Sequence, residues 1–351
     1  MPDIMAKIWL LAGVAVVIII IAVVAILLTQ QAAPTPAEKI PIKIGTIFAY
    51  YETAIPLLVA DALGYFKEAG LDVQLLGFPG GSEVRKAVVA GEVDFGAHSA
   101  VHVGIAQNAG ADMVIVMTLH EAHTIDICAR PGIESIEDLR GKVVGVTAEG
   151  SLSWASAISY LKRAGLEPDR DVKIIGIGSD PQVIVAALKG GRIDAYACWT
   201  NIVLTLTKLG IAKPLLGIMT DPKTHEKFMG APRIVENVIT SMRNEAKREA
   251  AIRLKKALKR ALEFIAKSSP EEIANVVLKS RFTRDIIGEV SREDLVDAIK
   301  LLKPAFSIDG AVYRDGWVHG TYMALLQPAL PQQFKPIPFE RVVWEGVTEV
   351  R

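Results

Sequence analysis

The chain has 351 residues, which is enough for two lobes of ordinary domain size. Its 39 Lys and Arg balance 39 Asp and Glu, and this argues against a nucleic-acid partner, which requires a basic face. Two cysteines, Cys128 and Cys198, are too few for a disulfide framework or a zinc or iron–sulfur site. They lie far apart, in different halves of the chain, so we expect separate thiols, with a single Cys128–Cys198 disulfide as the alternative.

The first feature along the chain is an apolar segment, Ile8–Leu28, without a charged residue. Its length matches the roughly twenty residues that cross a bilayer, so it predicts a membrane anchor with the globular part outside the cytoplasm. A cleaved signal peptide is the alternative, although its apolar region usually spans about 7–15 residues. We assign residues 1–28 to an anchor or signal sequence and residues 29–41 to a linker rich in Ala, Gln and Pro.

The remaining chain contains an internal repeat with a constant offset of 100 residues. Six residues of the first copy correspond to six of the second: Val84, Ala87, Val88, Gly91, Val93 and Asp94 to Ile184, Ala187, Leu188, Gly191, Ile193 and Asp194. Further upstream, Ile42–Thr46 corresponds to Val143–Thr147. A repeat of this length that occurs twice is not a solenoid period, so it predicts two α/β lobes facing one another.

Each half predicts strands that alternate with helices, which favours parallel pairing with right-handed crossovers. Pro56 opens a first helix that Gly70 ends, and Asp180 with Pro181 starts a helix in the second half. The predicted strands are Ile42–Ile47, Asp72–Leu76, Val93–Gly96, Met113–Leu119, Val143–Thr147, Val172–Ile177 and Ile193–Cys198. The predicted C-terminal helices are Glu245–Lys267, Pro270–Leu278, Arg292–Leu302 and Asp309–Leu326.

These elements define the expected domains. Lobe 1 comprises residues 42–119 together with 215–351, and lobe 2 comprises residues 120–214. The chain passes twice between the two lobes, so we expect a hinge of two segments, near 118–126 and 212–220.

Ligands of open parallel sheets bind beyond the carboxyl ends of the strands, where helix N-termini present unpaired N–H groups. Six loops are expected to surround such a cleft: Tyr50–Thr53, Gly80–Ser82, Ala97–Ser99, Ala148–Ser151, Ser179–Asp180 and Trp199–Asn201. Neighbouring Tyr50 and Tyr51 should point opposite ways, so that only one faces the ligand. The candidate ligand-binding residues are Tyr50, Tyr51, Glu52, Gly80, Gly81, Ser82, His98, Ser99, Glu149, Ser151, Asp180, Trp199, Thr200 and Asn201.

The histidines of the first half invite a metal site or a pH-sensitive hinge, but we favour His98 as a hydrogen-bond partner of the ligand because its loop faces the cleft. The other three are His102, His120 and His123. No Ser–His–acid order, nucleophile elbow, phosphate loop or dinucleotide fingerprint is present in the sequence. We therefore expect no catalytic residue, no cofactor and no metal.

The Gly80-Gly81 turn, the run Asp138–Val146 and the run Ala187–Ala195 followed by Trp199 resemble the nitrate/sulfonate/taurine and thiamine-precursor binding proteins of ABC importers. The resemblance covers roughly Ile42 to Asp309. It implies a type II periplasmic-binding fold, a two-stranded hinge, closure around a small organic solute, and delivery to a membrane permease with its ATPase. The family's Trp is usually followed by Glu-Pro, whereas Thr200-Asn201 follows here.

The six loops contain no Arg or Lys but include Glu52, Glu149 and Asp180. Because buried carboxylates oppose an anion in a low dielectric, we favour a heteroaromatic or amine-bearing solute over a simple anion. Two alternatives remain open. One is an enzyme on the same fold, such as a small-acid dehydratase; a thiamine-pyrimidine synthase would need a Cys-rich motif. The other is the sensor domain of a receptor.

Overall fold

The computed structural model describes residues 5, 9, 19–21, 39–330 and 335–351. Residues Ile40–Arg351 form one compact unit. Most of the predicted span Ile8–Leu28 and nearly all of its linker lie outside the described residues. Within the described part of the chain, no helix is long and apolar enough to cross a membrane.

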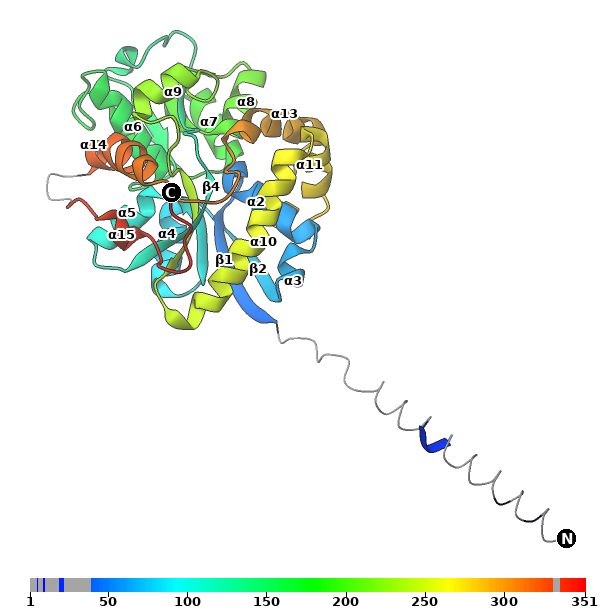
Figure 1. The fold of residues 1–351 in the computed structure, drawn as a ribbon. Helices are drawn as coiled ribbons and strands as arrows, with labels where there is room; N and C mark the ends of the chain where they lie inside the picture. Colours follow the sequence, from blue (N-terminus) through cyan, green and yellow to red (C-terminus); the bar gives the residue numbers. More distant parts are fainter. Residues whose placement is uncertain (1–4, 6–8, 10–18, 22–38, 331–334) are drawn as a thin grey trace. The chain divides into compact units, whose positions relative to one another are not determined.

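Two separate five-stranded sheets form the centre of the unit (Figure 1). Their strand orders are β2-β1-β3-β10-β4 and β7-β6-β8-β5-β9, and in each sheet the fourth strand runs antiparallel to the third. The equivalent orders confirm the prediction of two similar α/β lobes. The first sheet contains β1 (Ile40–Ile47), β2 (Leu71–Phe78), β3 (Phe95–Ser99), β4 (Met113–His120) and β10 (Asn237–Met242). The second contains β5 (Asp126–Ala129), β6 (Val143–Val146), β7 (Lys173–Gly176), β8 (Ala195–Cys198) and β9 (Lys213–Pro214).

The repeated aspartates do the same structural work in both lobes. The Asp94 carboxylate accepts a hydrogen bond from the backbone N–H of Lys43 at 2.9 Å, and Asp194 accepts one from that of Val143 at 2.9 Å. Each aspartate lies just before the third strand in its sheet order and bonds to the adjacent strand, at Lys43 within β1 and at Val143 at the start of β6, so it links the two strands. Gly91 and Gly191 are also equivalent, with φ of 75° and 69° in the left-handed region.

Helices cover both faces of the first sheet (Figure 1). One face packs against an apolar layer contributed by α2, α10, α11 and α13. Against the other face lie α4 and α5. The bounds are α2 (Tyr51–Ala62), α3 (Tyr65–Glu68), α4 (Gly81–Ala90), α5 (Val101–Asn108), η2 (Glu245–Lys247), α10 (Arg248–Lys267), α11 (Pro270–Val277), α12 (Thr283–Ile287), α13 (Arg292–Leu302) and η3 (Lys303–Ala305).

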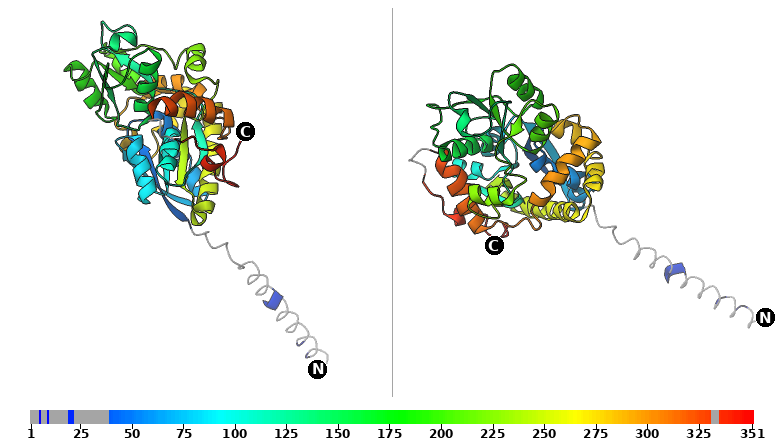
Figure 2. Two further views of the ribbon diagram at one scale, coloured as in Figure 1. Left: turned by 90° about the vertical axis from the view of Figure 1, so that its left-hand side faces the viewer. Right: turned by 90° about the horizontal axis from the view of Figure 1, so that it is seen from above.

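The second sheet carries its own helices, which form the green lobe in both views of Figure 2. Their bounds are η1 (Glu137–Leu139), α6 (Leu152–Arg163), α7 (Pro181–Lys189), α8 (Thr200–Lys208) and α9 (Pro222–Met229). The C-terminal region contributes η4 (Gly316–Leu326), which has π-type turns, α14 (Gln327–Ala329) and α15 (Phe339–Val342). Ser159 on α6 donates to the Ala324 carbonyl at 2.7 Å, so this region is not confined to the first lobe.

The first predicted helix differs from the structure at both ends. It begins at Tyr51, one turn before Pro56, and Gly64 with φ of 74° separates it from the short α3. The expected loop Tyr50–Thr53 is therefore the first turn of a helix. The last long helix likewise starts later than Asp309, at Gly316.

The second crossing between the lobes also differs from the predicted 212–220. After β9 the chain still belongs to the second lobe, because Leu216 and Ile218 donate backbone N–H groups to the Asp126 carboxylate at 3.0 and 3.1 Å. It returns only after α9, where the Ile234 N–H donates to the Glu121 carbonyl at 2.8 Å. The two crossing segments thus lie side by side at 121–125 and 231–236.

The two cysteines form a disulfide rather than two free thiols. Both belong to the second sheet, on β5 and β8, so their positions in different halves of the sequence did not separate them in space. In the antiparallel register Cys128 lies opposite Tyr196 and Cys198 opposite Asp126. The bridge is therefore a diagonal cross-strand pair, with a Cα–Cα distance of 6.0 Å.

Candidate functional site

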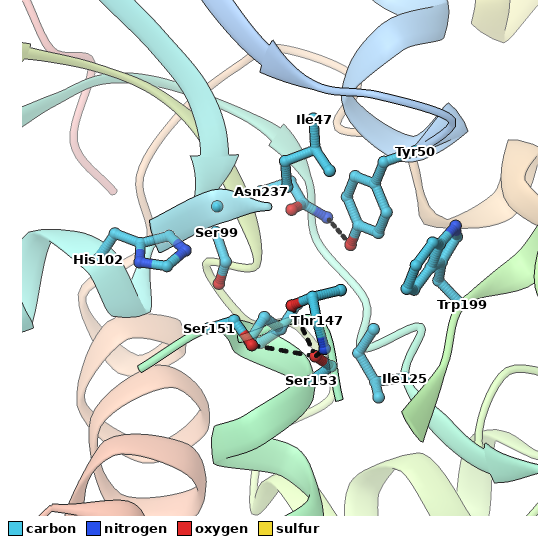
Figure 3. A pocket seen from close by; sticks show the side chains of 12 residues that line it. Ile47, Tyr50, Ser99, His102, Ile125, Thr147, Ser151, Ser153, Trp199 and Asn237 are labelled. Carbon is cyan, nitrogen blue, oxygen red and sulfur yellow. Dashed lines mark hydrogen bonds between the residues drawn. The ribbon is translucent and has the colours of Figure 1, made fainter. Parts of the chain in front are cut away.

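A cavity lies between the lobes, beyond the carboxyl ends of β1, β3, β6 and β8 (Figure 3). About 20 Å³ of it is open to the centre of a water-sized sphere, which is room for one or two water molecules. The lobes therefore hold a closed arrangement around a small space. The lining residues are Ile47, Tyr50, Gly81, Ser99, His102, Ile125, Thr147, Ser151, Leu152, Ser153, Trp199 and Asn237.

Tyr50 enters the cavity from the N-cap position of α2, with its ring edge-on to Trp199 at 5.5 Å between centroids. Its hydroxyl accepts a hydrogen bond from Asn237 Nδ2 at 3.2 Å (Figure 3). Burial, and then the nearby Glu52 carboxyl, raise the pKa of Tyr50 well above its ordinary value. The phenol therefore stays neutral and keeps its hydrogen as a donor.

His102 on α5 lies beside Ser99 at one edge of the cavity (Figure 3). Its Nδ1 lies 3.2 Å from Nη1 of Arg85, and a guanidinium can only donate. Nδ1 is therefore the acceptor, and the imidazole hydrogen lies on Nε2, which is buried and has no partner among the described residues. Burial, followed by the charges of His98 and Arg85, lowers the pKa of His102 well below its usual value, so the ring is a neutral donor.

Gly81 makes room for this donor. A Cβ at position 81 would lie 2.2 Å from His102 Nε2, a distance that no real side chain tolerates. The N-cap of α4 is Gly80, which has no side chain to satisfy the first N–H groups of the helix. Donors from α4 and His102 thus meet at one wall of the cavity.

The second lobe faces this wall with hydroxyls at the N-terminus of α6. Ser151 caps the helix by accepting from the Trp154 N–H at 3.2 Å. Ser153 accepts from the Thr147 N–H at 3.0 Å and lies 3.0 Å from the Ser151 hydroxyl (Figure 3). The positive end of the α6 dipole therefore points at the cavity from the side opposite His102.

Hydrogen bonds across the cleft hold the lobes together at Ala49. Its carbonyl accepts from Trp199 Nε1 and from Asn201 Nδ2, both at 3.1 Å. Ala49 has φ of 55°, a left-handed conformation that costs a residue other than Gly about 1–3 kcal/mol. The strained turn aims one lobe-1 carbonyl at two lobe-2 donors.

Two further contacts close the rim. Ser82 donates to the Glu149 carbonyl at 2.9 Å, and Ser179 donates to the Phe48 carbonyl at 3.2 Å. Arg85, besides orienting His102, donates to the Gly150 carbonyl at 3.4 Å. The lobes are therefore bridged on both sides of the cavity.

Five of the residues predicted from sequence line this cavity: Tyr50, Gly81, Ser99, Ser151 and Trp199. Tyr51 instead packs into the apolar layer behind the first sheet, as expected for only one of the two tyrosines. Gly80 lies at the rim, where an added Cβ would come within 3.6 Å of Thr147. Ser82 and Asn201 contact the opposite lobe rather than the cavity.

Glu52 and Thr200 form a buried contact behind the lining. The Thr200 N–H, at the start of α8, donates to Glu52 Oε1 at 3.1 Å, and Oε2 has no partner among the described residues. Burial raises the pKa of Glu52 to about 7, because its ionised form loses more hydration than the α8 terminus returns. This carboxyl joins the lobes but does not line the cavity.

His98 lies within β3 and not on the cleft-facing loop that the sequence predicts. Its Nε2 lies 2.8 Å from the Thr240 hydroxyl, which itself donates to the Gly96 carbonyl, so His98 connects β3 to β10. Burial lowers its pKa to about 3. The histidine that lines the cavity is four residues later, at the start of α5.

Glu149 and Asp180 are also outside the cavity. Asp180 caps α7 by accepting from the Gln182 N–H at 2.8 Å. Glu149 contributes its backbone carbonyl to the rim, and its side chain is exposed. Of the three carboxylates predicted near the ligand, Glu149 and Asp180 therefore lie outside the cavity, and Glu52 lies behind its lining near Tyr50.

Sequence reasoning missed Ile47, His102, Ile125, Thr147, Leu152, Ser153 and Asn237. Thr147 is the last residue of the predicted strand Val143–Thr147, whereas the observed strand ends at Val146, so the rule that ligands bind beyond carboxyl ends could have found it. Asn237 lies on β10, which follows the return crossing and pairs with β3 and β4 of the first sheet. No local sequence pattern predicts that position.

The other histidines pair within the hinge region. His123 Nδ1 lies 2.9 and 3.0 Å from the two carboxylate oxygens of Glu236, and its Nε2 lies 3.1 Å from the Ser156 hydroxyl. His120 Nδ1 donates to the Ala122 carbonyl at 3.2 Å. Across the described residues, no group of three His, Cys, Asp or Glu is placed to hold a metal ion.

Comparison with known sequences gives a consistent result. Residues 52–273 match the model of the family described as "NMT1/THI5 like". A protein of Brucella abortus named as a binding protein is 24% identical over 311 residues, which cover 85% of this chain and 91% of that protein. A Saccharomyces cerevisiae 4-amino-5-hydroxymethyl-2-methylpyrimidine phosphate synthase is 27% identical over 144 residues, covering 40% of this chain and 41% of that enzyme.

A solved structure shares the fold. The periplasmic aliphatic sulphonate binding protein of Escherichia coli superposes with a TM-score of 0.63 at 18% identity, covering 89% of this chain and 94% of that one. At this identity the match concerns the two-lobe architecture rather than individual residues.

Proposed function

Because the chain belongs to the NMT1/THI5-like family, we propose that it is the extracytoplasmic solute-binding component of an ABC import system. It closes its two lobes around a small organic solute and delivers that solute to a membrane permease with its ATPase. The crossing segments 121–125 and 231–236 act as the hinge.

The observation that carries the proposal is the donor of His102, a residue of the cavity lining. Its Nε2–H is buried without a partner among the described residues, and leaving such a donor unsatisfied costs about 1–3 kcal/mol. A ligand acceptor at that point recovers this free energy, and this supports a cavity that receives a polar group.

The donors favour a solute with an oxygen-rich, acceptor head. Tyr50, Ser99 and His102 supply donors from the first lobe, and the N-terminus of α6 supplies a positive dipole from the second. We infer a sulfonate or a comparable oxyanion on a small organic body, with Ile125 and Leu152 against the apolar part. This proposal differs from the expectation of an amine or heteroaromatic solute, and the positions of Glu149 and Asp180 outside the cavity support it.

The disulfide supports a location outside the cytoplasm, since such bridges persist in oxidising compartments. We propose that the segment Ile8–Leu28 tethers the protein to the cell membrane with the lobes on the extracytoplasmic side. The test is fractionation of the host cell: the anchored form stays with the membrane after washing in high salt, and a cleaved form is released as a shorter chain.

The binding proposal is tested by isothermal titration with four probes: ethanesulfonate, nitrate, ethylammonium and 4-aminopyrimidine. We expect ethanesulfonate to bind saturably at one site per chain, more tightly than nitrate, with no heat from the other two. Tighter binding of 4-aminopyrimidine or ethylammonium would overturn the inferred ligand class.

Two variants locate the site. His102→Phe keeps the ring but removes the Nε2 donor, and should weaken ethanesulfonate binding at least 30-fold, or about 2 kcal/mol. His120→Phe is the matched control, a buried histidine outside the cavity, and should leave the affinity within twofold. Thermal unfolding of both variants confirms that they fold.

An enzyme on the same fold is the second candidate, supported by the name of the yeast relative. The binding-protein name of the Brucella relative, which matches over far more of the chain, supports a receptor instead. Incubation with pyrimidine and small-acid substrates separates the two. Turnover that Glu52→Gln abolishes while binding persists would favour the enzyme, and unchanged substrates would favour the receptor.

A further inference from the structure

A second cavity lies directly behind the proposed solute site, and we call it the rear cavity. Its lining includes Thr124, Thr200, Met219, Glu226, Leu301 and Ala305. About 250 Å³ is open to the centre of a water-sized sphere, compared with about 20 Å³ for the cavity between the strand ends. It is thus large enough for an organic molecule, given that an apolar cavity of about 150 Å³ accepts benzene.

The two cavities share a wall. Ile125 and Trp199 line the solute cavity, whereas their chain neighbours Thr124 and Thr200 line the rear cavity. Consecutive side chains of an extended segment point to opposite sides, which explains the division at 124 and 125. A molecule in the rear cavity would therefore be separated from the solute by one layer of residues.

The rear cavity also spans both lobes and the hinge. Met219 and Glu226 belong to the second lobe, Leu301 and Ala305 to the first, and Thr124 to a crossing segment. The Thr200 N–H is held by Glu52 of the first lobe at 3.1 Å. Occupation of this cavity hence depends on how far the lobes are closed.

The lining is mostly apolar and has one sign of charge. Among the described residues that line it, Glu226 is the one carboxylate and there is no Lys or Arg. Burial lowers the pKa of His225, also in the lining, to about 4, so this ring adds no positive charge near neutral pH. Glu226 lines the cavity, is exposed to solvent, and forms no salt bridge within the described ranges.

We propose that the rear cavity is a second ligand site, which takes a small amine with an apolar body and couples its binding to closure on the solute. The ammonium group pairs with Glu226, and the body packs against Met219, Leu301 and Ala305. Because the ligand contacts both lobes, it favours the closed arrangement. By reciprocity, amine and solute then tighten each other's binding.

The test is isothermal titration with phenethylamine, 2-phenylethanol and 3-phenylpropanoate, which have similar bodies and differ in charge. We expect phenethylamine to bind best and 3-phenylpropanoate not to bind. Phenethylamine at saturation should tighten ethanesulfonate binding at least threefold. Equal binding of the carboxylate, or no binding of the amine, would overturn the proposal.

Variants distinguish the two cavities. Glu226→Gln should weaken phenethylamine binding at least tenfold and leave ethanesulfonate binding unchanged without the amine. Leu301→Trp fills the rear cavity and should abolish amine binding; Ala305→Leu fills it from a neighbouring position should Leu301→Trp not fold. Competition between phenethylamine and ethanesulfonate, or amine binding that survives both filling variants, would place the amine elsewhere and overturn the proposal.

Discussion

Equivalent pairs of neighbouring strands in the two lobes are linked by different kinds of bond. In the second sheet a disulfide joins Cys128 on β5 to Cys198 on β8. One repeat earlier, His98 on β3 stands at the position of Cys198, and Thr240 on β10 stands at that of Cys128, joined by a hydrogen bond of 2.8 Å. The registers agree, because Cys128 lies opposite Tyr196 and Thr240 opposite Gly96. Each pair links the third strand in its sheet order to the strand that follows a crossing segment, β5 in the second sheet and β10 in the first.

The comparison shows why symmetry of fold does not give symmetry of function. Asp94 and Asp194 form equivalent hydrogen bonds in the two lobes, and β5 and β10 are each linked to the neighbouring strand. The N-termini of α4 and α7 differ: α4 starts with Gly80 and Gly81 and faces the cavity, whereas Asp180 caps α7 with its own side chain. Gly81 at the start of α4 lines the cavity, whereas neither Asp180 nor any residue of α7 does.

The largest expected effect on stability comes from removing the two links between strands, the Cys128–Cys198 disulfide and the His98–Thr240 hydrogen bond. Replacing both cysteines by Ala opens a loop of 70 residues and should lower the free energy of unfolding by about 4 kcal/mol. Thr240→Val in the first sheet should cost about 1–2 kcal/mol, because it removes one buried hydrogen bond. Urea unfolding of both variants measures the difference, and equal losses would contradict it.

The next effect is the pH dependence of the free energy of unfolding that comes from Glu52, the buried carboxyl between the lobes. Its folded-state pKa of about 7 exceeds its ordinary value of 4.5, so the unfolded chain ionises first and stability falls as pH rises from 4.5 to 7. The loss is roughly 3 kcal/mol. Glu52→Gln keeps the acceptor for the Thr200 N–H and should remove this dependence, whereas Glu149→Gln at the exposed rim should not. An unchanged slope in Glu52→Gln would refute the assignment.

A slightly smaller effect separates the two repeated helix starts. Gly81→Ala places a Cβ at His102 Nε2 and should weaken ethanesulfonate binding about 100-fold, or roughly 2.7 kcal/mol. Pro181→Ala, at the equivalent position of α7, should leave the affinity within twofold. Calorimetry with both variants measures this, and similar losses would show that the α7 terminus also serves the ligand.

The smallest expected effect is the loss of stability on replacing either repeated aspartate, which should be equal in the two lobes. Asp94 and Asp194 each accept a backbone N–H of the adjacent strand, β1 or β6, and each lie near a cation, Lys247 at 2.9 Å and Arg130 at 3.9 Å. Alanine at either position should cost about 1.5 kcal/mol. A difference above about 1 kcal/mol between the two in urea unfolding would show that the equivalence is only geometric.

The fold was predictable because its signal is local and occurs twice. Periodicity, Gly91 and Gly191, and the Asp180-Pro181 start define strands and helices without reference to the rest of the chain. The return crossing was placed too early, since the bonds of Leu216 and Ile218 to Asp126 are contacts between distant segments. The same limitation applies to the disulfide, whose partners are adjacent only once the sheet order is known.

The site was predictable where a loop rule applied, and not where orientation decided. Tyr50, Gly81, Ser99, Ser151 and Trp199 follow strands or start helices at the correct edge. That His102 rather than His98 lines the cavity depends on His98 bonding to Thr240 of β10 and on His102 of α5 lying beside Arg85. Residue spacing encodes neither contact.

The central claim is that His102 offers its Nε2–H to the solute, and NMR of protein labelled with ¹⁵N at histidine tests it most directly. The His102 signals are assigned from their absence in His102→Phe. The account predicts hydrogen on Nε2 near neutral pH, and a marked shift of that Nε2–H resonance when ethanesulfonate saturates the protein. Hydrogen on Nδ1, or an Nε2–H signal that does not change at saturation, would contradict it.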